Sequence, residues 1–176
     1  MNLEINQEDK GNMKQRPLGI TIFSIIYILV GMGIFIIQIL FGKKMGDVSS
    51  LGISQLAFTI SITFLGLLSF ASGIGMWLGK KWGWWLGAFY CVYGVLRQVN
   101  VIIMLPGIIA QFGEPQQGIE YYWIKYAGRI LCYSLLFLYF FKRNVREYFD
   151  LEEYPKKKAI FILIGVAFGI VASGFI

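Results

Sequence analysis

Long runs of apolar residues alternate with short polar segments along most of the chain. A helix needs about 20 apolar residues to cross the roughly 30 Å hydrocarbon layer of a bilayer. Runs near or above that length occupy residues 18–41, 53–78, 84–109, 119–141 and 159–176. Membrane β-strands would instead show about ten residues of alternating polarity. The pattern therefore predicts an all-α, polytopic transmembrane helical bundle with four core helices and a fifth C-terminal helix.

Proline and polar residues set the expected ends of these elements. Pro17 starts the first run at a position where a missing N–H does no harm, whereas Pro106 and Gly107 should kink or end the third helix. Residues 1–16 are polar and aperiodic, so we expect a disordered cytoplasmic tail ahead of a transmembrane domain at 17–176.

The polar segment 142–158 is the largest between two runs. We expect it to continue the fourth helix as far as Pro155. Its acidic residues, Asp150, Glu152 and Glu153, are typical of a solvated charge run beside basic flanks and not of a metal site.

Composition supports a membrane protein. Hydrophobic residues make up 57% of the 176 residues, charged residues only 15%, and the mean hydropathy is +0.64. A soluble domain of this size could not bury so much apolar side chain, because its surface is large relative to its volume. The net charge of +6 is also found in nucleic-acid-binding proteins. Here the lysines and arginines lie between apolar runs, so we expect membrane orientation and no nucleic acid.

The distribution of basic residues predicts the orientation in the cell membrane, because short cytoplasmic segments carry an excess of lysine and arginine. If the N-terminus is cytoplasmic, the outer segments hold only Lys43 and Lys44. The inner segments then hold eleven basic residues: Lys10, Lys14, Arg16, Lys80, Lys81, Lys142, Arg143, Arg146, Lys156, Lys157 and Lys158. With five spans, the C-terminus lies outside. Aromatic residues at the starts of the third and fourth runs should form interfacial belts: Trp82, Trp84, Trp85, Tyr121, Tyr122 and Trp123.

Each of the first four runs carries one stripe of polar or small residues at helical spacing. The first two stripes contain Ser24, Tyr27, Gly31 and Gln38, and Gln55, Thr59, Gly66, Ser69 and Gly73. Lipid-facing surface should be apolar, so we expect the stripes to face one another. The small-residue spacings Gly83-xxx-Gly87 and Gly165-xxx-Gly169 should serve packing within the chain rather than dimerisation.

The third and fourth stripes carry the candidate site. Arg97 lies roughly 20 Å from the cytoplasmic start of its helix, and Arg129 roughly 18 Å from the cytoplasmic end of its own, at 1.5 Å rise per residue. Both therefore lie near the bilayer midplane. Their expected hydrogen-bonding neighbours are Lys125, Asn100, Tyr93 and Tyr126.

Arginine at the centre of a membrane helix costs about 2.5–3.5 kcal/mol on insertion scales, and it keeps its charge under nearly all conditions. No Asp or Glu lies deep within the runs to neutralise these two charges. The cost could be offset by water, by carbonyl and tyrosine oxygens, by an anionic ligand or lipid, or by an acidic helix of a partner. The alternative without a site is that each side chain snorkels toward the interface.

Chemistry at a catalytic centre is not indicated. The chain has no histidine, and its two cysteines, Cys91 and Cys132, lie in apolar runs where we expect buried, inert thiols. We therefore predict no enzyme activity, no metal and no cofactor.

The segments RPLGITIFSIIYILVGM and GKKWGWWLGAFY resemble a loose group of small prokaryotic membrane proteins that begin with an Arg-Pro-x-Gly-[Ile/Val]-Thr helix and later carry a Trp-rich basic turn. The resemblance covers about 30 residues and implies topology only.

The functional prediction is a membrane binding or transport component whose cationic core accepts an anionic group or lipid headgroup. The alternative is an accessory subunit whose arginines pair with acidic residues of a partner protein. The chain is short for a lone transporter, which favours a homo-oligomer or a complex with another membrane protein.

Overall fold

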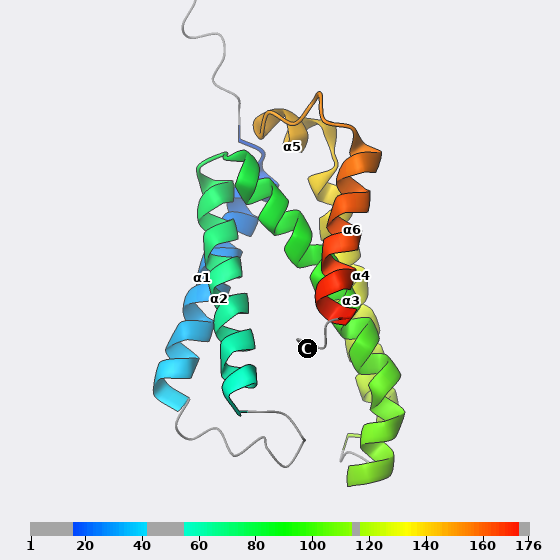
Figure 1. The fold of residues 1–176 in the computed structure, drawn as a ribbon. Helices are drawn as coiled ribbons and strands as arrows, with labels where there is room; N and C mark the ends of the chain where they lie inside the picture. The colour runs from blue at the N-terminus through cyan, green and yellow to red at the C-terminus, as the bar shows by residue number, and fades with distance from the viewer. Residues whose placement is uncertain (1–15, 42–54, 114–116, 173–176) are drawn as a thin grey trace, which may run out of the picture.

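The computed structural model describes residues 16–41, 55–113 and 117–172, and within these ranges every regular element is a helix. The order is α1 (Leu18–Phe41), α2 (Gln55–Trp77), α3 (Lys81–Phe112), α4 (Ile119–Phe140), α5 (Arg143–Tyr148) and α6 (Lys156–Ala172). Figure 1 shows α1 and α2 as one pair and α3, α4 and α6 as a second group, which meet at one end and separate toward the other. The predicted all-α class is confirmed for the described residues.

Three of these helices are long and apolar enough to cross a membrane, over Leu18–Leu40, Thr59–Trp77 and Lys81–Ala110. α4 falls short because Lys125 and Arg129 lower its hydropathy, and the described part of α6 has only 17 residues. The expected count of four core spans and a fifth therefore stays a prediction for α4 and α6. The beginning of the tail at 1–15 lies outside the described residues.

α1 and α2 pack along their stripes of polar and small residues, as the sequence predicts. A Cβ on Gly31 would lie 2.7 Å from the backbone nitrogen of Phe70, so the two backbones approach too closely for a side chain there. The Ser69 hydroxyl donates to the Tyr27 carbonyl at 3.0 Å, and Thr63 donates to the Gln38 side chain at 3.0 Å. The Ser69 and Thr63 hydroxyls are thereby satisfied within the helix pair.

The turn between α2 and α3 depends on three glycines. Gly79 has a φ of 64°, a left-handed conformation that suits glycine and ends α2. Beyond the turn, a Cβ on Gly83 would lie 2.1 Å from the carbonyl carbon of Gly75, so the two helices cross at their backbones. The Gly83-xxx-Gly87 spacing thus serves packing within the chain, as expected. No atom lies within 4 Å of a Cβ placed on Gly165 or Gly169, so the second spacing makes no such contact.

The core lies at the end where the two groups meet. Trp84 is buried and donates its indole N–H to the Phe140 carbonyl at the end of α4, at 2.9 Å. It was expected in the interfacial belt, and the correction has a physical reason, because its N–H satisfies a helix-end carbonyl that has no partner in its own helix. Trp82 and Trp123 are exposed, consistent with a belt.

The segment after α4 does not continue that helix to Pro155, so this expectation was wrong. The chain turns at Phe141 and Lys142 and forms the short helix α5. Arg146 is buried, and its guanidinium donates to the carbonyls of Leu151, Glu152 and Tyr154. The guanidinium thereby holds the loop between α5 and α6 folded back on itself.

Two further boundaries differ from the sequence-based expectation. Pro106 was expected to kink or end α3; the helix does not end there but runs through the proline to Phe112. Arg16, assigned to the mobile tail, donates to the Trp77 carbonyl at 2.7 Å and to the Tyr148 hydroxyl at 3.1 Å. Arg16 therefore packs with the helical part of the chain.

Candidate functional site

A polar groove of about 550 Å³ lies between α3 and α4. The two helices approach closely toward the start of α3 and the end of α4, where the Tyr133 ring lies 3.0 Å from a Cβ placed on Gly94. One turn further along α3, large polar side chains replace glycine and hold the helices apart. The groove is lined by Arg97, Gln98, Val101, Tyr126, Arg129, Cys132 and Tyr133.

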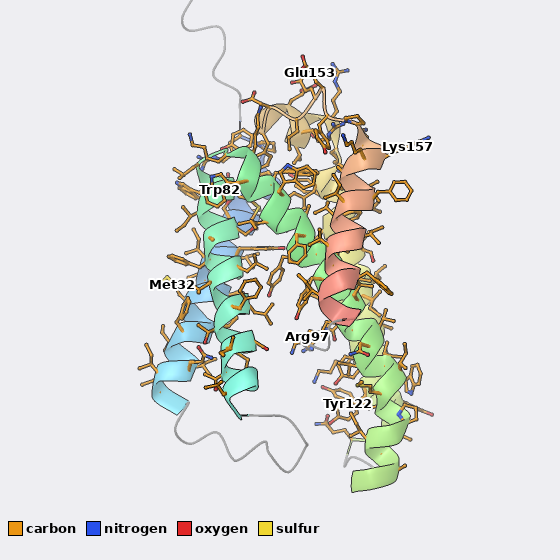
Figure 2. All side chains as sticks on the ribbon, in the orientation of Figure 1. Met32, Trp82, Arg97, Tyr122, Glu153 and Lys157 are labelled. Carbon is orange, nitrogen blue, oxygen red and sulfur yellow. The ribbon has the colours of Figure 1, made fainter. Side chains whose placement is uncertain are left out.

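Both predicted arginines line this one groove. They come from facing helices, and both side chains are exposed to it rather than buried among protein atoms. Figure 2 shows Arg97 directed toward the space between α3 and the α1–α2 pair. The Arg129 guanidinium also lies 6.0 Å from the centre of the Tyr126 ring, within the range of a cation–π interaction.

Neither arginine is neutralised by a carboxylate within residues 16–41, 55–113 and 117–172. The ion pair found in this part of the chain joins Arg143 and Glu147, at 2.6 Å, in α5. Two like charges in one groove repel each other, and one ring face on Arg129 offsets only a part of that cost. The groove is therefore a concentrated positive charge that lacks a counter-charge from its own walls.

Of the other four predicted site residues, only Tyr126 lines the groove. Lys125 points toward the rings of Tyr121 and Tyr122, with its Nζ 5.7 Å and 5.6 Å from their centres. Asn100 is half-buried and does not line the groove. Tyr93 lines a different cavity, described below. The sequence-based site thus keeps three of its members together, Arg97, Arg129 and Tyr126.

The predicted site lacked four residues of the groove, Gln98, Val101, Cys132 and Tyr133, and Gln98 is the buried polar one among them. Its side chain is only 6% exposed, and its Oε1 has no hydrogen-bond partner in the described structure. A buried polar atom without a partner costs about 1–3 kcal/mol. Its register offered a signal, because Gln98 follows Gly94 by four residues and therefore shares the face of α3 that packs on α4.

The two cysteines differ in exposure. Cys91 is buried beside the Tyr27 hydroxyl, whose oxygen lies 3.4 Å from its Sγ, and this agrees with an inert thiol. Cys132 is exposed and lines the groove, so the expectation that both are buried was wrong for this residue. The side of α4 that carries Cys132 is open because the polar groove, and not a packed helix, lies against it.

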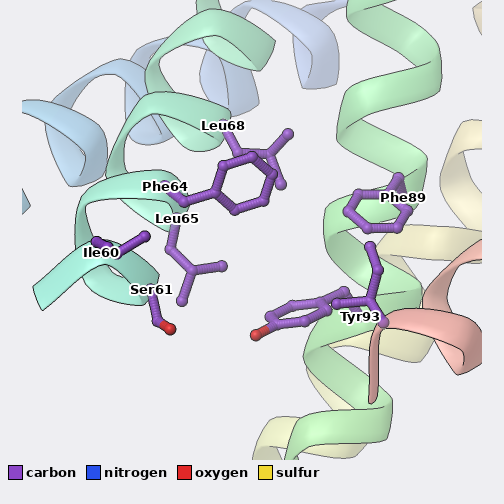
Figure 3. A pocket seen from close by; sticks show the side chains of 8 residues that line it. Ile60, Ser61, Phe64, Leu65, Leu68, Phe89 and Tyr93 are labelled. Atoms are coloured by element: carbon purple, nitrogen blue, oxygen red, sulfur yellow. The ribbon is translucent and has the colours of Figure 1, made fainter. Parts of the chain in front are cut away.

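An apolar cavity of about 240 Å³ lies next to the groove, where α2 and α3 separate (Figure 3). Its walls are Ile60, Ser61, Phe64, Leu65 and Leu68 of α2, Phe89 and Tyr93 of α3, and Ile170 of α6. Tyr93 precedes Arg97 by four residues, so the two lie one helical turn apart on the same face. The apolar cavity and the cationic groove are therefore neighbours along α3.

The position of the groove along α4 follows from the helical rise of about 1.5 Å per residue. Arg129 is eight positions from Tyr121 near the N-terminal end of α4, about 12 Å along the axis, and Tyr121 and Trp123 are exposed as belt residues would be. Exposed apolar side chains such as Leu131 and Leu135 follow on the outer faces of α4. The groove thus opens at a level of the helix where the surrounding surface is apolar.

Comparison with models of known protein families, with curated proteins and with solved structures finds no match to this chain. The resemblance to small membrane proteins with an Arg-Pro-x-Gly-[Ile/Val]-Thr helix stays a prediction. Functional inference therefore rests on the residues and geometry given above.

Proposed function

We propose that this chain is a membrane binding or transport component whose groove between α3 and α4 accepts an anionic group. The observation that carries the proposal is the convergence of Arg97 and Arg129 on one groove without a carboxylate from the described residues. An anion bound there would neutralise both charges. It would also replace the water that the guanidinium groups would otherwise have to retain in an apolar layer.

The shape and chemistry of the groove suit a group with several oxygens. A guanidinium presents donors in a planar fork, which binds carboxylate and phosphate through paired hydrogen bonds. Two forks from facing helices can engage different oxygens of one anion. The Tyr126 and Tyr133 rings on the same wall add hydroxyl groups that can donate a hydrogen bond.

The proposal predicts that anionic lipid remains with the protein through purification. Native mass spectrometry of the protein, extracted in a mild non-ionic detergent from membranes containing phosphatidylglycerol and phosphatidylethanolamine, should show retained phosphatidylglycerol. Arg97→Gln/Arg129→Gln should lose at least tenfold of this retention. The control Lys156→Gln/Lys157→Gln removes the same charge at exposed positions of α6 and should leave retention unchanged.

Equal retention of the anionic lipid by the wild type and the double arginine variant, with both proteins monodisperse, would refute an anion site in the groove. Equal loss in the arginine variant and the lysine control would also count against it, because net charge alone would then explain retention.

A second function is favoured by the open side of the groove. Arg97 and Arg129 are exposed, so a helix of another membrane protein could place a carboxylate between them. The chain would then be an accessory subunit of a larger complex. Ion pairs buried in this way orient helices even where they add little net stability.

Charge reversal separates the second function from the first. A partner held by these arginines should co-purify in a fixed ratio with the wild type and be lost from Arg97→Glu. Introduction of arginine at the partner's acidic residue should restore the complex with Arg97→Glu. Purification of the wild type without a stoichiometric protein partner would contradict the accessory role.

A further inference from the structure

The apolar cavity and the cationic groove share one face of α3, although they differ in chemistry. Tyr93 lines the cavity and Arg97 lines the groove one turn further along the helix. An elongated ligand could therefore occupy both, with an apolar part between α2 and α3 and a charged part between α3 and α4. Figure 3 shows Phe64, Leu65 and Leu68 of α2 across the cavity from Phe89 and Tyr93.

We propose that the ligand is a glycerophospholipid, whose phosphate binds Arg97 and Arg129 while one acyl chain fills the cavity between α2 and α3. This proposal rests on the anion site proposed above and adds the identity of the ligand class. Three features of the structure carry it: the pair of cations, the adjoining apolar cavity, and the buried Gln98 oxygen without a partner.

The cavity is an acyl-chain site by its lining and size. Apolar side chains of α2 and α3 make up nearly all of its walls. An apolar cavity of about 150 Å³ accommodates a benzene ring of six carbons, so the 240 Å³ found here accommodates a segment of about ten carbons. That volume suits one chain and is too small for the two chains of a diacyl lipid, whose second chain would remain in the bilayer.

A bilayer also supplies the occupant. α2 and α3 diverge from their shared turn, and a wedge between diverging helices in a membrane fills with hydrocarbon because chains surround it (Figure 1). Many lipids could enter such a wedge. Arg97 and Arg129 lie one helical turn beyond the wedge between α2 and α3, and they select a lipid whose headgroup is negative.

The Gln98 carboxamide selects among anionic headgroups. Its buried oxygen needs a hydrogen-bond donor. A phosphate diester at neutral pH has no hydrogen to give, and a fatty carboxylate has none either. A free hydroxyl near the phosphate supplies one, as in the headgroup glycerol of phosphatidylglycerol or in a lysophospholipid, and such a lipid can satisfy all three polar side chains at once.

Decanoyl lysophosphatidate and glycerol 3-phosphate provide matched probes. They share a phosphate and a glycerol hydroxyl, and only the first has an acyl chain. Their dissociation constants would be measured by thermal shift and calorimetry on the full chain in a non-ionic detergent, below the micellar concentration of the lipid. The dissociation constants of different variants are compared for the same ligand, so that partitioning of the ligand into detergent micelles is equal for all of them and cancels.

Leu65→Trp places an indole in the cavity and should weaken decanoyl lysophosphatidate at least tenfold, with glycerol 3-phosphate changed less than twofold. Leu67→Trp, two residues away on the exposed side of α2, is the matched control and should change neither. If Leu65→Trp does not purify as a folded protein, Ile60→Trp at the exposed rim of the cavity serves in its place.

Equal affinity of Leu65→Trp and Leu67→Trp for the lipid would overturn the acyl-chain site, as would equal affinity of Ile60→Trp and Leu67→Trp. If Arg97→Gln/Arg129→Gln still weakened both probes at least tenfold in that case, the anion site would stand without the chain site. If the arginine variant bound both probes as tightly as the wild type, the anion site itself would fail, and this proposal with it.

Discussion

Arginine has two different structural roles in this chain. The guanidinium of Arg146 is buried, and its Nη2 donates to three backbone carbonyls of the α5–α6 loop. The guanidinium groups of Arg97 and Arg129 line a groove and lack comparable acceptors within the described residues. A charged group needs acceptors or a counter-ion wherever water is scarce. The first arginine therefore stabilises the fold, and the other two are available for a ligand.

Arg146→Leu should lower the stability of the protein by about 3 kcal/mol, because the leucine leaves the carbonyls of the α5–α6 loop without donors. Thermal unfolding in detergent, followed by tryptophan fluorescence, measures the change. Arg143→Leu is the control, since its side chain is 91% exposed and pairs only with Glu147, and exposed pairs contribute little. Equal melting temperatures for the two variants would contradict the assigned role of Arg146.

Cys132 should react with a small membrane-permeant maleimide much faster than Cys91. Cys132 is exposed and lines the polar groove, where a reagent can reach it, whereas Cys91 is enclosed in the core. Mass spectrometry of Cys91→Ala and Cys132→Ala proteins would report each thiol separately. Similar rates at both thiols would contradict an open groove at Cys132.

At the scale of helices, glycine determines how closely elements approach. Gly83 lies against the backbone of Gly75 in the α2–α3 crossing, while no atom lies within 4 Å of a Cβ placed on Gly165. Each of the two glycines opens a Gly-xxx-Gly motif in the sequence. Only the structure distinguishes the one that is required for packing from the one that faces open surface.

Gly83→Ala should therefore destabilise the protein by about 2 kcal/mol, because the added methyl group has only backbone atoms to displace. Gly165→Ala should be neutral or slightly stabilising, since alanine is favoured over glycine in a helix. Chemical or thermal unfolding of both variants under the same conditions makes the comparison. A Gly83→Ala protein as stable as Gly165→Ala would show that the helices can separate at this crossing without loss.

α3 is long for a membrane-spanning helix. Its 32 residues extend about 48 Å, well beyond the roughly 30 Å of a hydrocarbon layer. In a bilayer a helix of that length tilts or projects beyond the layer, and Figure 1 shows α3 oblique to the α1–α2 pair. α2 and α3 separate beyond their shared turn, and the apolar cavity lies in this separation.

Sequence patterns predicted the contacts that depend on helical spacing. The stripes of α1 and α2, the shared groove of Arg97 and Arg129, and the packing of Gly83 all follow from residues three or four positions apart. Tertiary partners decided the rest. Trp84 is buried because its indole reaches the end of α4, and α4 ends at Phe140 where the chain turns into α5; neither feature is encoded in local periodicity.

At the scale of the molecule, the orientation predicted from basic residues is open to a direct test. In a Cys132→Ala background, Arg143→Cys and Gln117→Cys place exposed thiols before α5 and before α4. A membrane-impermeant maleimide should label Gln117→Cys in intact cells and Arg143→Cys only after the membrane is opened. The reverse pattern would invert the topology, and labelling of both in intact cells would show that α4 does not cross the membrane.

Arg97 and Arg129 form a charge pair that no carboxylate of the described residues neutralises, and the proposed function depends on this feature. Such a pair should cost stability when no anion is present and contribute stability when one is bound. The most direct measurement is thermal unfolding of the wild type and of Arg97→Leu/Arg129→Leu in nanodiscs of phosphatidylcholine, with and without one fifth phosphatidylglycerol.

In phosphatidylcholine alone the leucine variant should be the more stable protein, by about 1–4 kcal/mol, because leucine needs no counter-charge in an apolar layer. Phosphatidylglycerol should stabilise the wild type by about 2–3 kcal/mol when it is near a hundredfold above its dissociation constant, and it should leave the variant unchanged. If the wild type is the more stable protein in phosphatidylcholine and phosphatidylglycerol has no selective effect on it, the arginines are already satisfied and the account is wrong.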